Sequence, residues 1–536
     1  MNTQHWQRKP WQRSLLVGSV ASALVLVGCN DSDNSADSEG SGGAVVVPSA
    51  AAMTANRWYD EGETLLAQNI DLVDKTQTAK NIVLIVGDGM GISTLTAGRI
   101  LVGQQQTDNE GGEEYALSFE RFPHVALSKT YNTDSQTPDS AGTMTAMMTG
   151  VKTFRGGINI GSSVNYGDCT ASQQDELVSA LDLAKMAGMS AGIVATARVT
   201  HATPAATYAR TPARGWEADY YIKRDAQDGL GCTDIADQLV NYDVGGGLDV
   251  VLGGGRRNFL DYTQSEGYGY RDDGRNLITE WQAKDAGNVY VEDRQALAGI
   301  DVNDTGRLMG LFSRSHMSYE AQRDTNVEPS LAEMTESALN VLSKNEKGFF
   351  LMIEAGRIDH AHHGTKAGLA LHDTQALHEA VERVVEMTNP EETLIIVTAD
   401  HSHVMTMGGY AQRGNDILGL VRNSGGELQL ALDGKPYTTL LYGNGPSARD
   451  NQSYDANGDR VALYDEGLMV DSKNQALVPL SSETHAGEDV AIYATGPGAH
   501  FVRGTLEQNM IFHIMNQAGD LINRAEEGVA EAGSGS

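Results

Sequence analysis

Apolar and polar positions along the chain follow two alternating patterns. Residues 81–91 (NIVLIVGDGMG) form a continuous apolar, β-branched run interrupted by Gly-Asp-Gly, which predicts a buried strand with Asp88 at its carboxyl end. Residues 176–197 predict a helix, a glycine turn and a strand, and residues 248–255 predict a further strand that ends in glycines.

The alternation continues through the second half of the chain. Ser330 and Glu333 form a capping-box pattern at the start of a predicted helix, which leads into the strand GFFLMIE, ending at Glu354. A second amphipathic helix precedes TLIIVTADH, a strand that ends at Asp400 and His401. Helices that alternate with continuous apolar strands predict an α/β fold, with a large, mostly parallel central sheet and helices on both faces.

Residues 402–482 break this pattern, because they are rich in Gly, Asn and Asp and contain only short strand-like runs. They predict a subdomain inserted before the last core strand, DVAIYATG, and the end of the chain from Glu526 is predicted to be disordered. The predicted divisions are a signal peptide (1–29), a flexible polar tether with an N-terminal segment (30–75), the first part of the α/β domain (76–401), the insert (402–482), the final strand and helix of the domain (483–522) and a disordered tail (523–536).

The beginning of the chain resembles a bacterial export signal. Residues 1–13 contain three basic residues and no acid, and the apolar run 14–28 is shorter than the about 20 residues of a membrane-spanning helix. The run ends in LVGC, which resembles a lipobox and makes Cys29 the predicted lipidation site; ordinary cleavage nearby, with Cys29 incidental, is the alternative. We therefore expect an exported protein, periplasmic or at the cell surface, with a lipid anchor as its membrane attachment.

Charge and cysteine content narrow the class of protein. The 536 residues include 39 basic and 71 acidic ones, a net charge of −32, which argues against a nucleic-acid binder and fits an acidic surface in a saline habitat. Besides Cys29, the chain contains Cys169 and Cys232. In an oxidising compartment these two favour a disulfide over a metal pair.

Three predicted strands end in residues that can bind a metal: Asp88, Glu354 and the pair Asp400-His401. Any one of these acids is more simply explained as a helix cap or a turn former. In a parallel sheet, however, the carboxyl ends of the strands line the crevice where ligands bind. The repetition of the pattern at three strands therefore favours a metal site.

The motif RIDHAHH strengthens this interpretation. Asp359 and His363 are four residues apart and share a helix face, and His485 lies just before the last strand. Mixed imidazole and carboxylate ligands suit zinc, whereas an all-oxygen set suits magnesium. His360 and His362 are predicted to lie beside the metals or in solvent, without binding them.

The stretch TPDSAGTMTAMMTG (137–150) predicts the start of a helix. Ser140 lies where the first free N–H groups of the helix point, a position that favours a phosphate group. No G-x-S-x-G pattern surrounds it. The local sequence leaves open whether Ser140 is a helix cap or a nucleophile.

Six motifs together resemble the alkaline phosphatase family: DGMG, PDSAGTMTAMMTG, HATPA, EAGRIDHAHH, TADHSH and ETHAGED. They occur in the family's order, and the similarity spans about residues 80–517. His201 and His360 stand where the enteric bacterial type carries Asp and Lys, so the chain is more similar to the animal and marine bacterial branches. This difference leaves the metal preference of the magnesium-type site open.

The resemblance implies a role for each matched residue. Ser140 matches the nucleophile, Arg214 the phosphate-binding arginine and Asp139 the residue that holds Arg214. His201 and His360 are expected near the magnesium without binding it directly. The implied metal ligands are Asp88, Asp400 and His401 at the zinc beside the serine, Asp359, His363 and His485 at the other zinc, and Asp88, Glu354 and Thr203 at the magnesium.

This family relationship implies hydrolysis of small phosphate monoesters through a phosphoserine intermediate, with two Zn²⁺ and one Mg²⁺ per subunit. It also implies a homodimer, with the insert resembling the family's crown region at the subunit interface. A sulfatase is disfavoured because TPDSAG is not C-x-P-S-R. A phosphodiesterase of the same superfamily and an inactive, metal-stabilised surface lipoprotein are the remaining alternatives.

Overall fold

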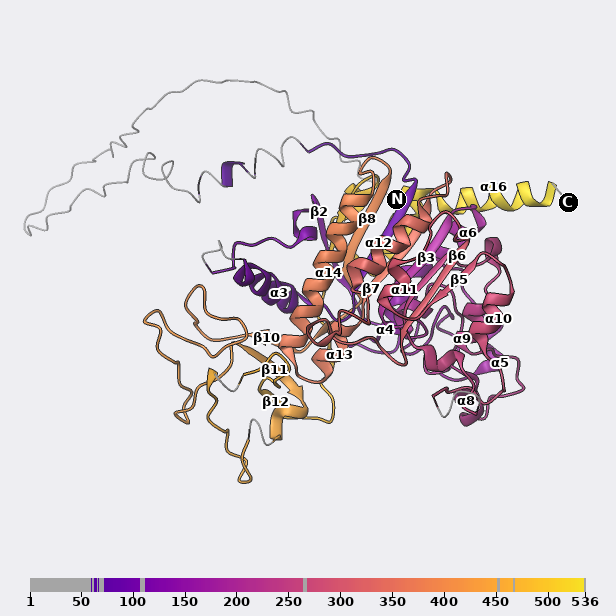
Figure 1. The fold of residues 1–536 in the computed structure, drawn as a ribbon. Coiled ribbons are helices and arrows are strands. Elements are labelled where there is room, and N and C mark those ends of the chain that lie inside the picture. The colour runs from indigo at the N-terminus through magenta and orange to yellow at the C-terminus, as the bar shows by residue number, and fades with distance from the viewer. Residues whose placement is uncertain are drawn as a thin grey trace, which may run out of the picture. The chain divides into compact units, whose positions relative to one another are not determined.

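The computed structural model describes residues 72–106, 111–263, 268–450, 454–465 and 468–534, and a few helical positions between residues 59 and 66. Its main unit, Asn69–Ser536, is built around a ten-stranded sheet (Figure 1). The strands of this sheet are β1 (Asn81–Gly87), β2 (His124–Lys129), β3 (Ser190–Arg198), β4 (Val250–Gly254), β5 (Asn288–Val291), β6 (Arg307–Ser313), β7 (Phe349–Ala355), β8 (Thr393–Ala399), β14 (Val490–Thr495) and β15 (Gly504–Glu507).

The strand order is β15-β2-β14-β8-β1-β7-β3-β4-β6-β5. β14 runs antiparallel to its neighbours β2 and β8, and the other neighbouring pairs are parallel. The predicted large, mostly parallel sheet is therefore confirmed.

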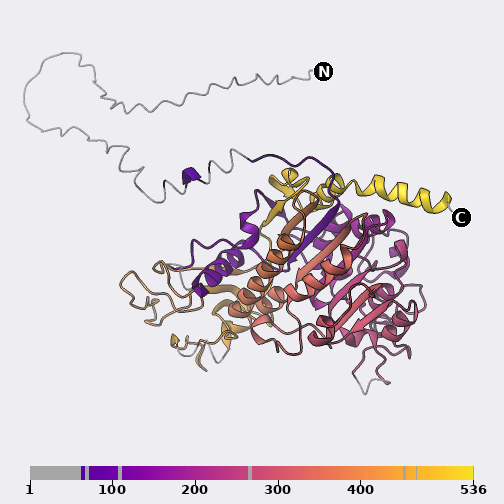
Figure 2. The same cartoon turned by 45° about the horizontal axis from the view of Figure 1, so that its top comes forward.

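Strand β1 explains why helices cover both faces of the sheet. Successive side chains of a strand point to opposite faces. Ile82 and Leu84 belong to one buried cluster, with α4 (Ser140–Thr149), α6 (Ala180–Met186) and α15 (Met510–Gly519). Val83 and Ile85 belong to the other, with α12 (Leu331–Leu342) and α14 (Ala367–Met387), which Figures 1 and 2 show running along the sheet.

The remaining helices are short apart from α3 and α16. The predicted capping box at Ser330 and Glu333 is present at the start of α12. The other helices are α3 (Ile92–Gln105), α5 (Cys169–Ser172), α7 (Ala202–Ala205), α8 (Asp219–Arg224), α9 (Ile235–Val240), α10 (Leu277–Ala283), α11 (Arg294–Ala298), α13 (Arg357–His363) and α16 (Leu521–Ser534), with 3₁₀ turns at Ser118–Arg121, Val244–Gly246, Arg256–Phe259, Glu320–Gln322, Pro446–Arg449 and Ala499–Phe501.

The segment that follows β8 forms two small sheets. β10 (Met405–Met407), β11 (Leu440–Gly445) and β12 (Ala476–Pro479) make one, and its residues Met405 and Leu440 pack with Leu101 of α3 and Leu371 of α14. β9 (Ser402–His403) pairs antiparallel with β13 (His485–Ala486), which places His485 opposite His403. This second pairing brings the last motif of the chain to the carboxyl end of β8.

The predicted disorder of the C-terminal tail is wrong for most of its length. Residues Leu521–Ser534 form helix α16, drawn in yellow in Figure 2. Leu521 and Ala525 are buried, and Gly528 lies so close to the carbonyl oxygen of Met186 on α6 that a Cβ atom would approach it to 2.1 Å. Alanine and glutamate favour helix, and packing against α6 stabilises a segment whose composition alone suggested disorder.

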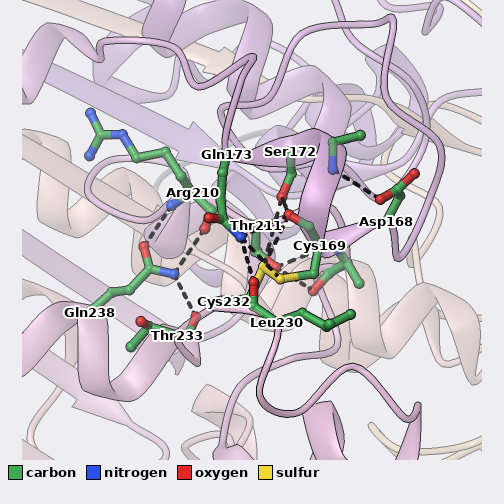
Figure 3. The surroundings of a disulfide bond; sticks show 12 residues. Asp168, Cys169, Ser172, Gln173, Arg210, Thr211, Leu230, Cys232, Thr233 and Gln238 are labelled. Atoms are coloured by element: carbon green, nitrogen blue, oxygen red, sulfur yellow. Dashed lines mark hydrogen bonds between the residues drawn. A yellow bond between two sulfur atoms is a disulfide. The ribbon is translucent and has the colours of Figure 1, made fainter.

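The predicted signal peptide, Cys29 and most of the tether lie outside the described residues. Within the described part of the chain, no helix combines the length and apolarity needed to cross a membrane. Cys169 and Cys232 are joined by a disulfide with a Cα–Cα distance of 5.8 Å (Figure 3). The bond links α5 to the segment before α9.

Candidate active site

Three buried carboxylates converge at the carboxyl ends of the central strands. In the sheet register, Val86 lies beside Glu354, and Gly87 lies beside Ala399. Asp88 and Asp400, each one residue farther along, therefore meet Glu354 at the same edge, and all three are fully buried. The pKa of Asp88 is raised well above its usual range, mainly by burial and next by the charges of Asp400, Asp359 and Glu354. Like charges held this close require a cation or protons.

Ser140 is the first residue of helix α4, but it is not the helix cap. Asp139 caps the helix, and its side chain accepts a hydrogen bond of 3.2 Å from the amide of Gly142. The Ser140 hydroxyl is free to face the carboxylates: its Oγ lies 3.4 Å from Asp88 Oδ1 and 3.1 Å from His401 Nε2. The sequence alone left open whether Ser140 is a helix cap or a nucleophile, and the structure gives the cap to Asp139.

The first ligand group consists of Asp88, Asp400 and His401. His401 Nε2 is 3.5 Å from Asp88 Oδ1 and 3.2 Å from Asp400 Oδ2. The amides of Gly89 and His401 each donate to Asp400 Oδ1 at 2.9 Å, which fixes that carboxylate. All three side chains are completely buried.

The second group converges on a single oxygen, Asp359 Oδ1. His363 Nε2 lies 3.3 Å from this atom and His485 Nε2 lies 3.2 Å from it. The two Nε2 atoms are themselves 3.2 Å apart. The other ring nitrogens are held by carbonyl oxygens, His363 Nδ1 by Glu483 and His485 Nδ1 by Pro138. Two imidazoles oriented in this way turn their Nε2 lone pairs toward one point, which fits a cation bound between them.

The third group joins Asp88, Glu354 and His201. Asp88 Oδ2 and both carboxylate oxygens of Glu354 are buried and accept no hydrogen bond of ordinary geometry from a described residue. The pKa of Glu354 is raised to about 8, mainly by burial and next by the charges of Asp400 and Asp359. The Thr203 hydroxyl is buried beside this group. An oxygen-rich set with unsatisfied acceptors fits a hard divalent ion.

Arg214 contacts both the residue that caps α4 and the third group. Its Nη1 donates to Asp139 Oδ2 at 2.8 Å, and its Nη2 lies 3.2 Å from His201 Nε2. Burial acts to raise the pKa of Asp139, but the charge and hydrogen bond of Arg214, together with hydrogen bonds from the amides of Gly142 and Gly156, outweigh it, so that this pKa lies below its usual range. Asp139 thus remains ionised and holds the guanidinium next to Ser140.

Comparison with known proteins shows which family the chain belongs to. The family model for alkaline phosphatase matches residues 79–521. The chain belongs to the alkaline phosphatase family. It is 44% identical over 473 residues to the tissue-nonspecific isozyme of Gallus gallus and 41% identical over 475 residues to that of Homo sapiens; in both cases 86% of this chain and 88% of the relative are covered.

Solved alkaline phosphatases share the fold at low identity. The enzyme of Thermus thermophilus aligns with a TM-score of 0.59 at 24% identity, over 85% of this chain and 96% of its own. The enzyme of the Antarctic bacterium TAB5 aligns with a TM-score of 0.55 at 20% identity, over 83% and 99%. The family and its curated relatives show a metal-binding enzyme that hydrolyses phosphate monoesters, so a phosphodiesterase and an inactive lipoprotein are not favoured.

His403 is a site residue of this phosphatase that the sequence reasoning missed. Its Nε2 lies 2.8 Å from Asp359 Oδ1 and its Nδ1 lies 2.5 Å from Glu483 Oε2. Burial acts to lower the pKa of His403, but Glu483 and Asp359 outweigh it and raise the pKa to about 10. The motif TADHSH contains two histidines, and a ligand role was assigned from the sequence only to the first, His401. The second histidine, His403, was the signal available in the sequence.

Three further histidines surround the phosphatase site. His360 lies near His201 of the third group, with ring centroids 5.3 Å apart. His316, from the loop after β6, was missed because no motif marks it; its ring lies 4.0 Å from that of His360. His362 is buried between the Thr94 hydroxyl, at 3.0 Å, and the Tyr442 hydroxyl, at 2.9 Å, so the alternative of solvent exposure is wrong for it.

Proposed function

We propose that this phosphatase transfers the phosphoryl group of a monoester first to Ser140 and then to water. The observation that carries the proposal is the position of Ser140 Oγ, 3.4 Å from Asp88 and 3.1 Å from His401, within a completely buried ligand group. A serine in a hydrophobic core has no such neighbours. The proposed nucleophile therefore lies within about hydrogen-bond distance of residues that can bind a cation.

The donor sets support two zinc ions and one magnesium ion. Asp88, Asp400 and His401 would hold the zinc beside Ser140, and Asp359, His363 and His485 would hold the second zinc. Asp88, Glu354 and Thr203 would hold the magnesium, with His201 and His360 beside it. Imidazole with carboxylate suits zinc, and carboxylates with a hydroxyl suit magnesium. When bound, the three ions carry more positive charge than the four carboxylates carry negative charge, and they stabilise the serine and leaving-group oxygens as these become negative.

The chain itself orients the nucleophile. Ser140 is 2% exposed and lies in the first turn of α4, where free amide groups favour a phosphate. In the first transfer, the Oγ–phosphorus bond forms, the bond from phosphorus to the ester oxygen breaks, the serine proton passes to solvent and the departing alcohol oxygen takes up a proton. Water then forms a bond to phosphorus, the Oγ–phosphorus bond breaks, and the proton of the water returns to Ser140 as inorganic phosphate leaves. Asp88 Oδ1 accepts the hydrogen bond of the serine hydroxyl and so directs its lone pairs away from the carboxylates.

Arg214 holds the phosphoryl group in this scheme. Its planar guanidinium can bind two phosphoryl oxygens together, which a lysine ammonium cannot copy. The ion pair with Asp139 keeps the side chain in place when the site is empty of substrate. Such a positive clamp is needed because the protein as a whole has a net charge of −32.

The proposal is tested with a chromogenic phosphate monoester and a matching diester. We expect hydrolysis of the monoester that is lost on chelation, restored by zinc with magnesium, and lower by at least about a thousandfold in Ser140→Ala. The control Ser163→Ala, on an exposed loop, should retain activity. Monoester hydrolysis that survives both the chelator and Ser140→Ala would contradict the mechanism, and a diester preference would favour the phosphodiesterase alternative.

We also propose export, lipidation at Cys29 and a homodimer. The lipobox-like LVGC supports the anchor, and exposed apolar side chains on β12, such as Leu477 at 78% exposure, support an interface formed by the insert. Partition of the protein into detergent should be lost in Cys29→Ser, and light scattering should give the mass of two chains. Detergent partition that persists in the variant, or a monomeric mass, would refute the respective proposal.

A further inference from the structure

The mouth of the active site is marked by the few site residues that reach solvent. The side chains of Asp88, Asp400 and His401 are 0% exposed, whereas those of Arg214, His363 and His485 are 25%, 32% and 14% exposed. A phosphate held at Ser140 must therefore project its alcohol portion outward, past Arg214 and the two histidines. A side chain next to Arg214 at this opening would therefore be in a position to contact the alcohol portion of the substrate.

Tyr166 lies against the backbone that supports Arg214. A Cβ atom placed on Gly156 would approach the ring of Tyr166 to 2.6 Å at Cε2 and 2.9 Å at Cδ2, so the ring rests directly on this glycine. The amide of Gly156 donates to Asp139 Oδ1 at 3.0 Å, and its carbonyl accepts from the amide of Arg214 at 2.9 Å. The ring thus covers the residue that joins both members of the Asp139–Arg214 pair.

The ring itself is available for contact, because Tyr166 is 59% exposed. The pKa of its phenol is raised, mainly by partial burial and next by the charge of Asp225, and the charge of Arg214 opposes the rise. The phenol therefore lies within electrostatic reach of the guanidinium. An aromatic ring of this size left in solvent beside a substrate clamp is available to pack against a substrate.

The segment that carries Tyr166 is held at both ends. The amide of Gly161 donates to the carbonyl of Asp175 at 2.8 Å, and the amide of Gly167 donates to the carbonyl of Pro212 at 3.1 Å. Asp168 caps α5, and the next residue, Cys169, forms the disulfide to Cys232 (Figure 3). Pro212 is two residues before Arg214, so the position of Tyr166 is tied to that of the clamp.

We propose that Tyr166 determines specificity by forming an aromatic subsite for the alcohol portion of aryl phosphate monoesters, at the Arg214 side of the mouth. The inference rests on the proposed function of Ser140 and Arg214, and it adds the class of ester that the site prefers. An aryl ring packs against Tyr166 in the transition state, whereas a short alkyl group does not reach it. No chemical step changes.

The experiment compares phenyl phosphate with ethyl phosphate. Tyr166→Ala and Tyr166→Leu should lower kcat/KM for phenyl phosphate about two- to tenfold, the effect of one aromatic pair, and leave the value for ethyl phosphate unchanged. Tyr166→Phe should behave as the wild type. The control Tyr262→Ala removes a tyrosine that is 58% exposed elsewhere on the surface and should alter neither ester.

A binding measurement complements the kinetics and does not depend on turnover. Calorimetry with phenylphosphonate and methylphosphonate should show that Tyr166→Ala weakens the first by a similar factor and leaves the second unchanged. Equal losses for both esters would mean that Tyr166 acts only through Arg214, and no loss would mean that its ring does not reach the substrate; either result overturns the inference. A wild-type protein that hydrolyses neither ester would instead overturn the proposed function itself.

Discussion

Replacement of His403 by alanine should reveal how the site holds Asp359. His403 joins two buried carboxylates, Asp359 at 2.8 Å and Glu483 at 2.5 Å. Their side chains are 5% and 0% exposed. Without His403, the negative charge of Glu483 loses its nearest partner, and Asp359 is free to turn away from His363 and His485.

The size of the effect follows from these contacts. Leaving a buried charge without its partner costs about 3–5 kcal/mol of folding free energy. Losing the residue that orients a metal ligand costs about 10- to 100-fold in metal affinity. We therefore expect His403→Ala to unfold at markedly lower denaturant when metal-free, and to bind zinc about 10- to 100-fold more weakly in competition with a chromogenic chelator.

His378→Ala is the matched control. His378 is also buried, at 4% exposure, and also uses both ring nitrogens, accepting from the Ser118 amide at 3.0 Å and meeting the Tyr115 hydroxyl at 3.1 Å. It lies on α14 and takes no part in the ligand groups, so its loss should lower stability without changing zinc affinity. The reasoning fails if His403→Ala and His378→Ala show the same zinc affinity as the wild type.

Three further predictions concern other parts of the molecule. Cys232→Ser removes the disulfide to Cys169, 63 residues away in the chain, and should lower the unfolding free energy by about 4 kcal/mol in urea titrations; an unchanged midpoint would refute this. Arg214→Lys should weaken inhibition by inorganic phosphate nearly as much as Arg214→Ala, because the ammonium cannot bind two oxygens together, and a Lys variant equal to the wild type would exclude the clamp. Burial acts to raise the pKa of Glu507, but Lys129 and Lys152, both at 2.9 Å, lower it to about 2. A lowered carboxyl pKa contributes stability above about pH 4.5 that is lost as the pH falls toward 2, so the difference in Tm between wild type and Glu507→Gln should shrink over that range; a constant difference would show that the ion pairs do not stabilise the fold.

The strand-end carboxylates show what can be predicted from one sequence. Asp88, Glu354 and Asp400 each follow a continuous apolar run, and runs of this kind make parallel strands whose carboxyl ends meet. Their convergence therefore required only the fold class. The tail residues show the opposite case, because α16 forms by packing on α6, a contact that no local pattern reveals.

His316 and His403 could not be placed from the chain alone. His403 contacts Glu483, 80 residues later, because β9 pairs with β13. His316 meets His360 because the loop after β6 reaches α13. Both contacts depend on which segments lie side by side after folding. No motif marks His316, and the motif TADHSH marks His403 without indicating Glu483 as its neighbour.

By itself, the sequence determined the fold class, the nucleophile candidate, the order of the six motifs and hence the family, because hydrophobic periodicity and motif spacing are local properties of the chain. Only the tertiary structure decided that Asp139 caps α4 and leaves the Ser140 hydroxyl free, that Arg214 pairs with Asp139, and that the ring of Tyr166 rests on Gly156. The physical reason is distance: hydrogen bonds and ion pairs act over about 3 Å, and folding alone brings residues tens to hundreds of positions apart within that range.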